Sequence, residues 1–237
     1  MSLLDDASLF LDFDGTLVDL VDRPDQVVAD PELRALLADL DTRMEGRLAV
    51  ISGRSIAQLD AMLGAVAQQL ALAGSHGCEQ RHQGELSQPE RPASLDRAAE
   101  RLIPFVDRHP GALIETKSYG VALHYRLRPE AEEEAAALAV ELARDLGLQL
   151  QAGKMMVELR VPGCDKGDAV RRLTAQAPMK GSRPIVIGDD RTDENAFLAA
   201  ATMGGASILV GPPRETAAQY RLDDPRAVRA WLREALA

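Results

Sequence analysis

The strongest constraint on the fold is a series of five short apolar runs that alternate with helix-forming stretches. The runs are residues 9–11, 48–51, 70–73, 185–187 and 207–210. The stretches at 32–40, 56–63, 166–175 and 194–201 have the apolar spacing of amphipathic helices. Alternating strands and helices predict a doubly wound parallel α/β sheet, Rossmann-like, whose strands are apolar on both faces because helices cover both.

Polar residues gather where these predicted strands end. Asp12 and Asp14 follow the first run, Ser52 follows the second, and Asp189 follows the fourth. Ligands of open α/β sheets bind at the carboxyl ends of the strands, so these side chains are expected to meet at one edge. Aspartates that lie close together need a cation between them, and oxygen ligands without a neighbouring His or Cys favour Mg²⁺. A carboxylate held beside Mg²⁺ can act as a nucleophile towards phosphorus.

Each of these residues also has a purely structural interpretation. Aspartate and threonine are common in turns and at helix N-caps, so Asp14, Thr16 and Asp193 could have such roles. Ser52 is a frequent turn residue, and Lys166 fits the exposed start of a helix. The adjacent acids after the fourth run are harder to explain in this way, because they repel each other unless a cation lies between them.

Residues 81–162 lack the buried parallel-strand pattern. Helices are predicted at 93–108 and 129–146, and antiparallel hairpins at 113–128 and 148–161. The last strand alternates apolar with mostly polar residues, as expected for a sheet that helices cover on one side. We therefore expect a catalytic α/β core formed by residues 1–80 and 163–237, with an α+β cap inserted at 81–162.

Composition narrows the possible partners and the compartment. The 237 residues carry a formal net charge of −10, and 3% are aromatic, which argues against nucleic acid or a membrane as partner. Cys78 and Cys164 are too few for a disulfide scaffold and form no CxxC pair, so both are expected to be reduced thiols. The acidic N-terminus lacks a secretory pattern, which predicts a cytoplasmic protein.

Four groups of residues resemble, in order and spacing, the motifs of the haloacid dehalogenase superfamily of phosphatases. The groups are Asp12 to Thr16, Ser52, Lys166, and the acids Asp189, Asp190 and Asp193. The resemblance covers the whole chain, including the point where a cap is inserted. It implies a phosphoric monoester hydrolase in which Asp12 attacks phosphorus and forms an aspartyl-phosphate, while Asp14 acts first as general acid and then as general base.

The same resemblance implies roles for the remaining residues. Ser52 would hydrogen-bond a phosphoryl oxygen, and Lys166 would place a point charge beside the phosphate and the nucleophile. Asp12, the main-chain carbonyl of Asp14, and Asp189 would hold Mg²⁺. Supporting positions are Thr16, Gly53, Asp190 and Asp193.

A narrower resemblance concerns the substrate. Residues 188–194, Gly-Asp-Asp-Arg-Thr-Asp-Glu, look like the GDDxTDE signature of the trehalose-6-phosphate phosphatases, and residues 52–54, 74–79, 115–126 and 153–167 resemble further blocks of that family. The resemblance implies that the cap residues Glu115, Lys117 and Glu158 grip glucose hydroxyls. Lys154 is a further candidate in the cap. Arg54 and His76 would approach the sugar phosphate from the core.

Strand parity agrees with a recognition face on the cap. Glu115 and Lys117 share one parity and can point into one cleft. His124 and Tyr125 are neighbours, so at most one of them is expected to face that cleft. The alternative is that these charges only form cross-strand ion pairs on an exposed sheet.

Several functions fit this pattern. The leading hypothesis is a Mg²⁺-dependent phosphatase that converts trehalose 6-phosphate to trehalose and phosphate, with a possible functional link to a trehalose-phosphate synthase. Related enzymes would act on sucrose 6-phosphate, a hexose phosphate or a glycerate-linked sugar phosphate. A receiver-like phospho-acceptor domain is disfavoured by the second acid, Asp14, and by the large cap. A non-catalytic partner of a synthase is disfavoured by the intact catalytic positions.

Overall fold

The computed structural model describes residues 4, 6–21, 27–153 and 155–236. The chain divides into two compact units. The core unit comprises Met1–Gln88 and Cys164–Ala237, and the cap unit comprises Pro89–Gly163. Each unit has its own hydrophobic core.

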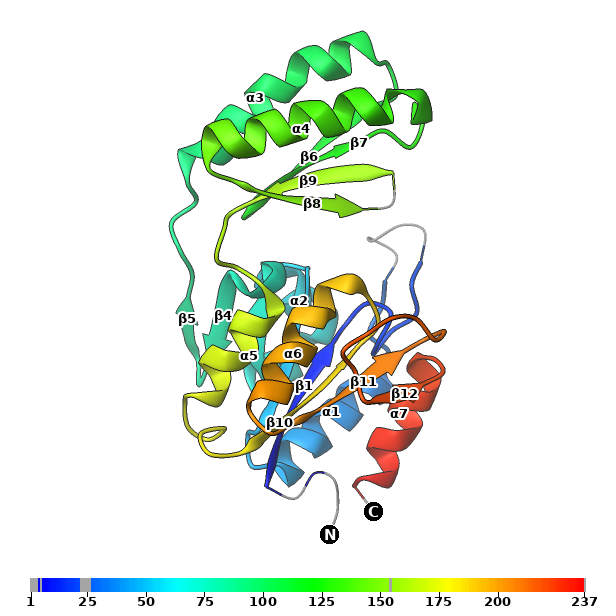
Figure 1. Cartoon of the computed structure of the whole chain (residues 1–237). Coiled ribbons are helices and arrows are strands. Elements are labelled where there is room, and N and C mark those ends of the chain that lie inside the picture. The colour runs from blue at the N-terminus through cyan, green and yellow to red at the C-terminus, as the bar shows by residue number, and fades with distance from the viewer. Residues whose placement is uncertain (1–3, 5, 22–26, 154, 237) are drawn as a thin grey trace. The chain divides into compact units, whose positions relative to one another are not determined.

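The core unit contains an eight-stranded sheet in the order β12-β11-β10-β1-β2-β3-β4-β5 (Figure 1). In chain order its strands are β1 (Ala7–Asp12), β2 (Leu48–Ile51), β3 (Ala71–Gly74), β4 (Glu79–His82), β5 (Glu85–Ser87), β10 (Arg183–Gly188), β11 (Ala206–Val210) and β12 (Tyr220–Leu222). The six strands from β12 to β3 are parallel, and β4 and β5 extend the sheet in antiparallel fashion. The predicted doubly wound α/β class is thus confirmed, with an antiparallel edge that the sequence pattern did not indicate.

Helices cover both faces of this sheet. They are α1 (Pro31–Arg43), α2 (Ile56–Leu63), α5 (Lys166–Thr174), α6 (Glu194–Thr202) and α7 (Pro225–Glu234). Leu9 and Leu11 of β1 pack in one buried cluster with residues of α1, α2 and α7, whereas Phe10 between them packs with α5 and α6. This alternation is the period of two that strand geometry imposes, and it explains why the whole of β1 is buried.

The strands that sequence reasoning missed are short and polar. β4 has the sequence Glu-Gln-Arg-His and nevertheless pairs with β3. Arg81 is largely buried there because its guanidinium pairs with Asp60 and donates to the carbonyl of Ala67. The sequence pattern assigned residues 81–88 to the insertion, but they belong to the core unit, where β4 and β5 are strands of its sheet.

The cap unit is a four-stranded antiparallel sheet in the order β6-β7-β9-β8 with two helices (Figure 1). Its elements are α3 (Ala93–Arg108), β6 (Leu113–Lys117), β7 (Gly120–His124), α4 (Glu132–Leu146), β8 (Gln149–Gly153) and β9 (Met156–Arg160). Val121, Leu123, Val157 and Leu159 pack with both helices in one core. The alternate residues of the same strands form the opposite face, as pleating requires.

The two cysteines are joined, contrary to the expectation of reduced thiols. Cys78 and Cys164 form a disulfide with a Cα–Cα distance of 4.9 Å and a sequence separation of 86 residues. The prediction was wrong because only the fold brings these distant positions together: Cys78 directly precedes β4, and Cys164 lies two residues before the start of α5. Spacing along the chain cannot reveal such a pair.

Candidate active site

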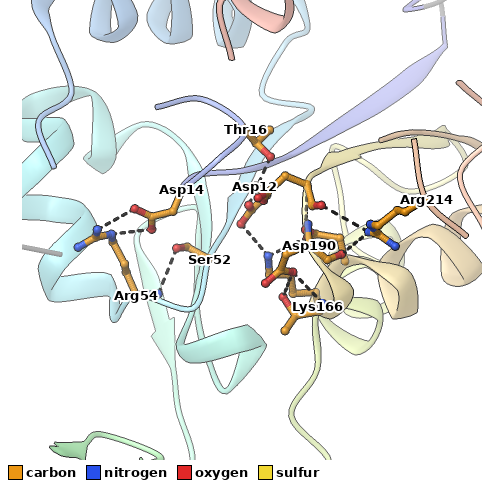
Figure 2. A network of polar contacts seen from close by, with 11 residues as sticks. Asp12, Asp14, Thr16, Ser52, Arg54, Lys166, Asp190 and Arg214 are labelled. Carbon is orange, nitrogen blue, oxygen red and sulfur yellow. Dashed lines mark hydrogen bonds and ion pairs between the residues drawn. The ribbon is translucent and has the colours of Figure 1, made fainter. Parts of the chain in front are cut away.

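Asp12 and Lys166 form the centre of the site. Asp12 is the last residue of β1, and Lys166 is the first residue of α5, which the Asp165 side chain caps by accepting from the N–H of Asp168. The ammonium Nζ of Lys166 lies 2.6 Å from Asp12 Oδ1 (Figure 2). Both side chains are buried, so a charge-assisted hydrogen bond joins the predicted nucleophile to the predicted lysine.

Asp193 links that pair to the loop that follows β10. Its Oδ1 lies 2.7 Å from Lys166 Nζ, and its Oδ2 accepts from the backbone N–H groups of Asp189 and Asp190 at 3.1 Å each. Asp193 therefore orients Lys166 and the loop together. The Asp190 carboxylate accepts from the N–H and hydroxyl of Thr192 and caps the short helical turn Arg191–Asp193. Its negative charge also acts on Lys166 and Asp12.

Three carboxylates are placed closely enough to hold a metal ion. One oxygen each from Asp12, Asp189 and Asp193 lies within 4.8 Å of the other two. Gly15 makes room for this arrangement: its φ is +81°, and a Cβ atom there would overlap the Asp189 carboxylate. Three acids facing one lysine leave an excess of negative charge, and hard oxygen donors are the ligands that Mg²⁺ prefers. The donor set thus fits the expected Mg²⁺, and the cluster includes Asp193, to which the resemblance gave only a supporting role.

The protonation behaviour reflects this crowding. Burial raises the pKa of Asp12 to about 7, against the opposing attraction of Lys166, and burial likewise raises the pKa of Asp193 to about 7. Burial together with the charges of neighbouring acids raises the pKa of Asp189 to about 6. For Lys166, burial would lower the pKa, but the charges of the surrounding aspartates outweigh it and raise the value. The lysine is therefore charged, and the acids gain protons easily without a further cation.

Asp14 and Arg54 form a second group at the same sheet edge. The Nε and Nη2 atoms of Arg54 each lie 2.7 Å from a different oxygen of Asp14, a bidentate ion pair (Figure 2). The hydroxyl of Ser52 accepts from the N–H of Arg54 at 3.1 Å. Thr16 is buried, and its hydroxyl donates to Asp12 Oδ2 at 3.4 Å. Arg54, which the resemblance assigned to the sugar phosphate, contacts the predicted acid/base in this structure.

The loops after β2 and β3 are interlocked. The N–H groups of Ser75 and His76 donate to the carbonyls of Arg54 and Ser52, at 2.7 and 2.8 Å. The His76 ring packs over Gly53, where a Cβ atom would approach ring carbon Cε1 to 2.7 Å. This close approach explains why position 53 needs a glycine. It also holds the ring of His76 beside Ser52 and Arg54.

The predicted recognition residues of the cap contact one another on the polar face of its sheet. Lys117 Nζ lies 3.0 Å from Glu158 Oε2 and 3.9 Å from Glu115 Oε2, and His124 Nε2 lies 2.8 Å from Glu115 Oε2. Tyr125 is buried in the cap core instead. Of the neighbouring residues His124 and Tyr125, only His124 therefore lies on the polar face. Lys154, the remaining cap candidate, is outside the described residues.

Two charged residues of the site were not singled out from the sequence. Arg214, in the loop after β11, lies 2.7 Å from the carbonyl of Asp190 and pairs with Glu194 at the start of α6 (Figure 2). The rule that identified the other motifs would have found it, because Arg214 also follows the carboxyl end of a parallel strand. Glu79 lies within residues 74–79, which resemble a block of the family, but no role was predicted for it. Its carboxylate accepts from the Ser75 hydroxyl at 2.6 Å and from the N–H of Ile56 at 2.8 Å.

Comparison with known proteins agrees with this geometry. The sequence profile of a family described as trehalose-phosphatase matches residues 10–226. A probable trehalose-phosphate phosphatase of Sinorhizobium fredii is 39% identical over 213 residues, which cover 89% of this chain and 80% of that protein. The trehalose-6-phosphate phosphatase of Escherichia coli is 37% identical over 226 residues, 94% of this chain and 84% of that protein.

Solved structures show the same relation. The C-terminal domain of a trehalose-6-phosphate phosphatase from C. albicans superposes with a TM-score of 0.81 and 25% identity, covering 99% of this chain and 95% of that one. The profile match includes every described site residue named above, from Asp12 to Arg214. The chain therefore belongs to the trehalose-phosphatase family.

Proposed function

We propose that this protein hydrolyses trehalose 6-phosphate to trehalose and phosphate through an aspartyl-phosphate on Asp12. The observation that carries this proposal is the convergence of Asp12, Lys166, Asp189 and Asp193 at one edge of the sheet, at hydrogen-bonding and metal-binding distances. Family membership supports the sugar phosphate as substrate.

The reaction divides into two displacements. A carboxylate oxygen of Asp12 attacks phosphorus, the bond from phosphorus to the sugar oxygen breaks, and Asp14 gives its proton to the leaving alkoxide. Water then attacks the aspartyl-phosphate, Asp14 takes a proton from that water, and the bond to Asp12 breaks to release phosphate. Lys166 keeps its positive charge throughout and balances charge on Asp12 and on the phosphoryl oxygens.

We propose Mg²⁺ as the cofactor. When bound, it would neutralise charge on the transferring phosphoryl group. Asp12 and Asp189 are the side chains proposed to hold it, together with the main-chain carbonyl of Asp14. The close grouping of the acids and the excess of negative charge support this assignment. Because Asp193 already accepts from Lys166 and two backbone amides, we assign it mainly to orienting these groups.

Arg54 has a role in the resting enzyme. Both oxygens of Asp14 are engaged by its guanidinium, so Asp14 must be released before it can transfer a proton. A bound phosphate monoester offers Arg54 another bidentate partner. We infer that substrate draws Arg54 from Asp14 to the sugar phosphate, with Ser52 donating to a phosphoryl oxygen and His76 beside it.

The cap unit supplies the selectivity in this proposal. Carboxylates and a lysine on one polar face match the many donors and acceptors of a disaccharide. Glu115, Lys117 and Glu158 are the described residues proposed to bind glucose hydroxyls, and Lys154 stays a prediction. A functional link to a trehalose-phosphate synthase also stays a prediction.

The cellular location stays a prediction as well. Among the described residues, no helix is both long and apolar enough to cross a bilayer. The disulfide between Cys78 and Cys164 is a bond that reducing compartments disfavour.

The proposal is tested by phosphate release from a panel of monoesters, with and without Mg²⁺. The panel contains trehalose 6-phosphate, sucrose 6-phosphate, a hexose phosphate, a glycerate-linked sugar phosphate and a small aryl phosphate. We expect Mg²⁺-dependent turnover with the highest kcat/KM on trehalose 6-phosphate. A higher value on another sugar phosphate would reassign the substrate, and a stable phosphoprotein without turnover would favour a receiver-like function.

The nucleophile is tested by Asp12→Asn. The change keeps the size of the side chain, and we expect phosphate release from every monoester to fall by at least about 10⁴-fold, because the attacking carboxylate is lost. Circular dichroism and a thermal melt would establish that the variant is folded. Normal turnover by a folded variant contradicts the assignment.

A further inference from the structure

Side chains hold the loop that carries Asp189 from two sides. On the amide side, Asp193 accepts from the N–H groups of Asp189 and Asp190. On the carbonyl side, Arg214 Nη2 lies 2.7 Å from the oxygen of Asp190 and 3.5 Å from that of Asp189. The N–H and C=O groups of these two residues, which follow the end of β10, are thus met by side chains, and the Asp190 carbonyl also accepts from the N–H of Asp193 at 3.3 Å.

Arg214 is itself fixed in place. Its Nη1 pairs with Glu194 and donates to the carbonyl of Glu215 at 3.0 Å. The Glu194 carboxylate also accepts from the Thr216 hydroxyl and from the N–H of Ala217, at 2.8 Å each. The segment after β11 is therefore tied to the start of α6, and Arg214 joins both to the loop after β10.

We propose that Arg214 is a positioning residue for the metal site, acting through the Asp189 main chain. The direction of the Asp189 carboxylate follows from its backbone, and that carboxylate must face Asp12 across the space left by Gly15. By holding the carbonyls of residues 189 and 190, Arg214 keeps the carboxylate aimed at Asp12. This inference rests on the Mg²⁺-dependent chemistry proposed above.

The guanidinium geometry is essential to this role. Arg214 contacts Glu194 and Glu215 through one terminal nitrogen and the two carbonyls through the other. A rigid planar fork can serve both sides at once, whereas the ammonium of a lysine is a single compact point. Arg214→Lys should therefore keep part of the effect, and Arg214→Gln should lose most of it.

The experiment measures Mg²⁺ binding to the metal-free protein by isothermal titration calorimetry, without substrate. We expect Arg214→Gln to raise the dissociation constant about tenfold or more, the usual consequence of losing a partner that orients a metal ligand. Arg214→Lys should fall between that variant and the parent. In turnover assays the half-saturating Mg²⁺ concentration should rise by a similar factor, while the KM for the sugar phosphate and kcat at saturating Mg²⁺ stay within about threefold.

Arg221→Gln is the matched control. Arg221 lies in the same part of the chain, donates to the carbonyl of Gly211 and pairs with Asp223, but it does not contact the loop after β10. Its replacement should leave Mg²⁺ affinity unchanged. If Arg214 had only a structural role, Arg214→Gln, like Arg221→Gln, would lower the thermal stability of the protein, but it would not selectively lower the affinity for Mg²⁺.

The outcomes separate this inference from the proposed function. If Arg214→Gln and Arg214→Lys bind Mg²⁺ as tightly as the parent protein, the positioning role is overturned. If Arg214→Gln does not fold, the intermediate Mg²⁺ affinity of Arg214→Lys decides the question. If Mg²⁺ binding weakens as expected but the parent protein does not hydrolyse trehalose 6-phosphate, the positioning role holds and the substrate assignment fails.

Discussion

The core and cap units place their charged residues by different means. In the core, Asp12 and Asp189 meet because parallel strands bring their carboxyl ends to one edge, and Lys166, the first residue of α5, lies beside Asp12. In the cap, Glu115, Lys117 and Glu158 lie along and across antiparallel strands, and they meet because alternate residues share a face.

The two arrangements also differ in electrostatics. Lys166 is buried between two carboxylates, and each member depends on the others for compensation of its charge. Lys117 pairs with Glu158 on a sheet face that no helix of its own unit covers. A buried network tolerates little change. On the cap face the Glu158 side chain is also largely buried, but Lys117 and Glu115 keep 33% and 51% of their side chains exposed and can exchange internal partners for the hydroxyls of a ligand. In the proposed function, the core carries out the reaction and the cap selects the substrate.

The largest effect is expected when the buried lysine of the core network is replaced. Lys166→Met leaves Asp12 and Asp193 without their shared cation, and we expect turnover of all phosphate monoesters to fall by about 10³-fold. The free energy of unfolding should fall by about 3 kcal/mol, because breaking a buried ion pair leaves uncompensated charge. Activity assays and urea unfolding measure the two effects. Lys180→Met, at an exposed lysine, is the control, and equal effects of both changes would remove Lys166 from the mechanism.

A change in the cap should instead discriminate between substrates. Glu158→Gln keeps the side-chain size but removes the charge that faces Lys117, and we expect kcat/KM for trehalose 6-phosphate to fall roughly 100-fold through lost hydroxyl contacts. Hydrolysis of a small aryl phosphate, which has no sugar to recognise, should change little. Glu141→Gln, on the helical side of the cap where Glu141 pairs with Arg101, is the matched control. Loss of the same size on both substrates would mean that Glu158 is not a recognition residue.

The smallest expected effect is a dependence of stability on pH that is particular to the core site. The folded protein holds protons on Asp12 and Asp193 up to about pH 7, whereas in the unfolded chain aspartates lose them near pH 4. Between these values the folded state binds more protons, so stability falls as pH rises. For one such group the difference between pH 5.5 and pH 8 is about 2 kcal/mol.

Thermal melts of metal-free protein measure this effect. The melting temperature should be higher at pH 5.5 than at pH 8, and saturating Mg²⁺ should raise it most at pH 8, where the acids are ionised. Asp12→Asn should weaken the pH trend, because the residue no longer titrates. A melting temperature that rises with pH in the absence of metal would contradict the environment described for these acids.

Much of the core was predictable because its signals are local. An apolar run that ends in Asp or Ser indicates a buried strand and also the end of the strand where a ligand binds. Asp12, Ser52 and Asp189 follow this pattern. β4 was missed because its stability comes from pairing with β3 and from the Arg81 contacts, not from an apolar pattern.

Other features arise only in three dimensions. The bidentate contact of Arg54 with Asp14 joins positions 40 residues apart, and no periodicity indicates it. The disulfide has the same character, because it depends on how distant segments pack. Arg214 follows the end of a strand, but its contacts with the loop after β10 also depend on that packing. In the cap, parity placed Glu115 and Lys117 on one face, but only the register shows that Glu158 lies within reach of Lys117.

The bond between Cys78 and Cys164 has a topological consequence. It closes residues 78–164 into a covalent ring that contains the whole of Pro89–Gly163. A protease that nicks the backbone once inside this ring yields two fragments that stay attached, so the polypeptide migrates on a denaturing gel near its full mass until a reductant separates the pieces. The ring also contains β4 and β5 of the core sheet, whereas on the return side Cys164 directly follows the last residue of the cap unit.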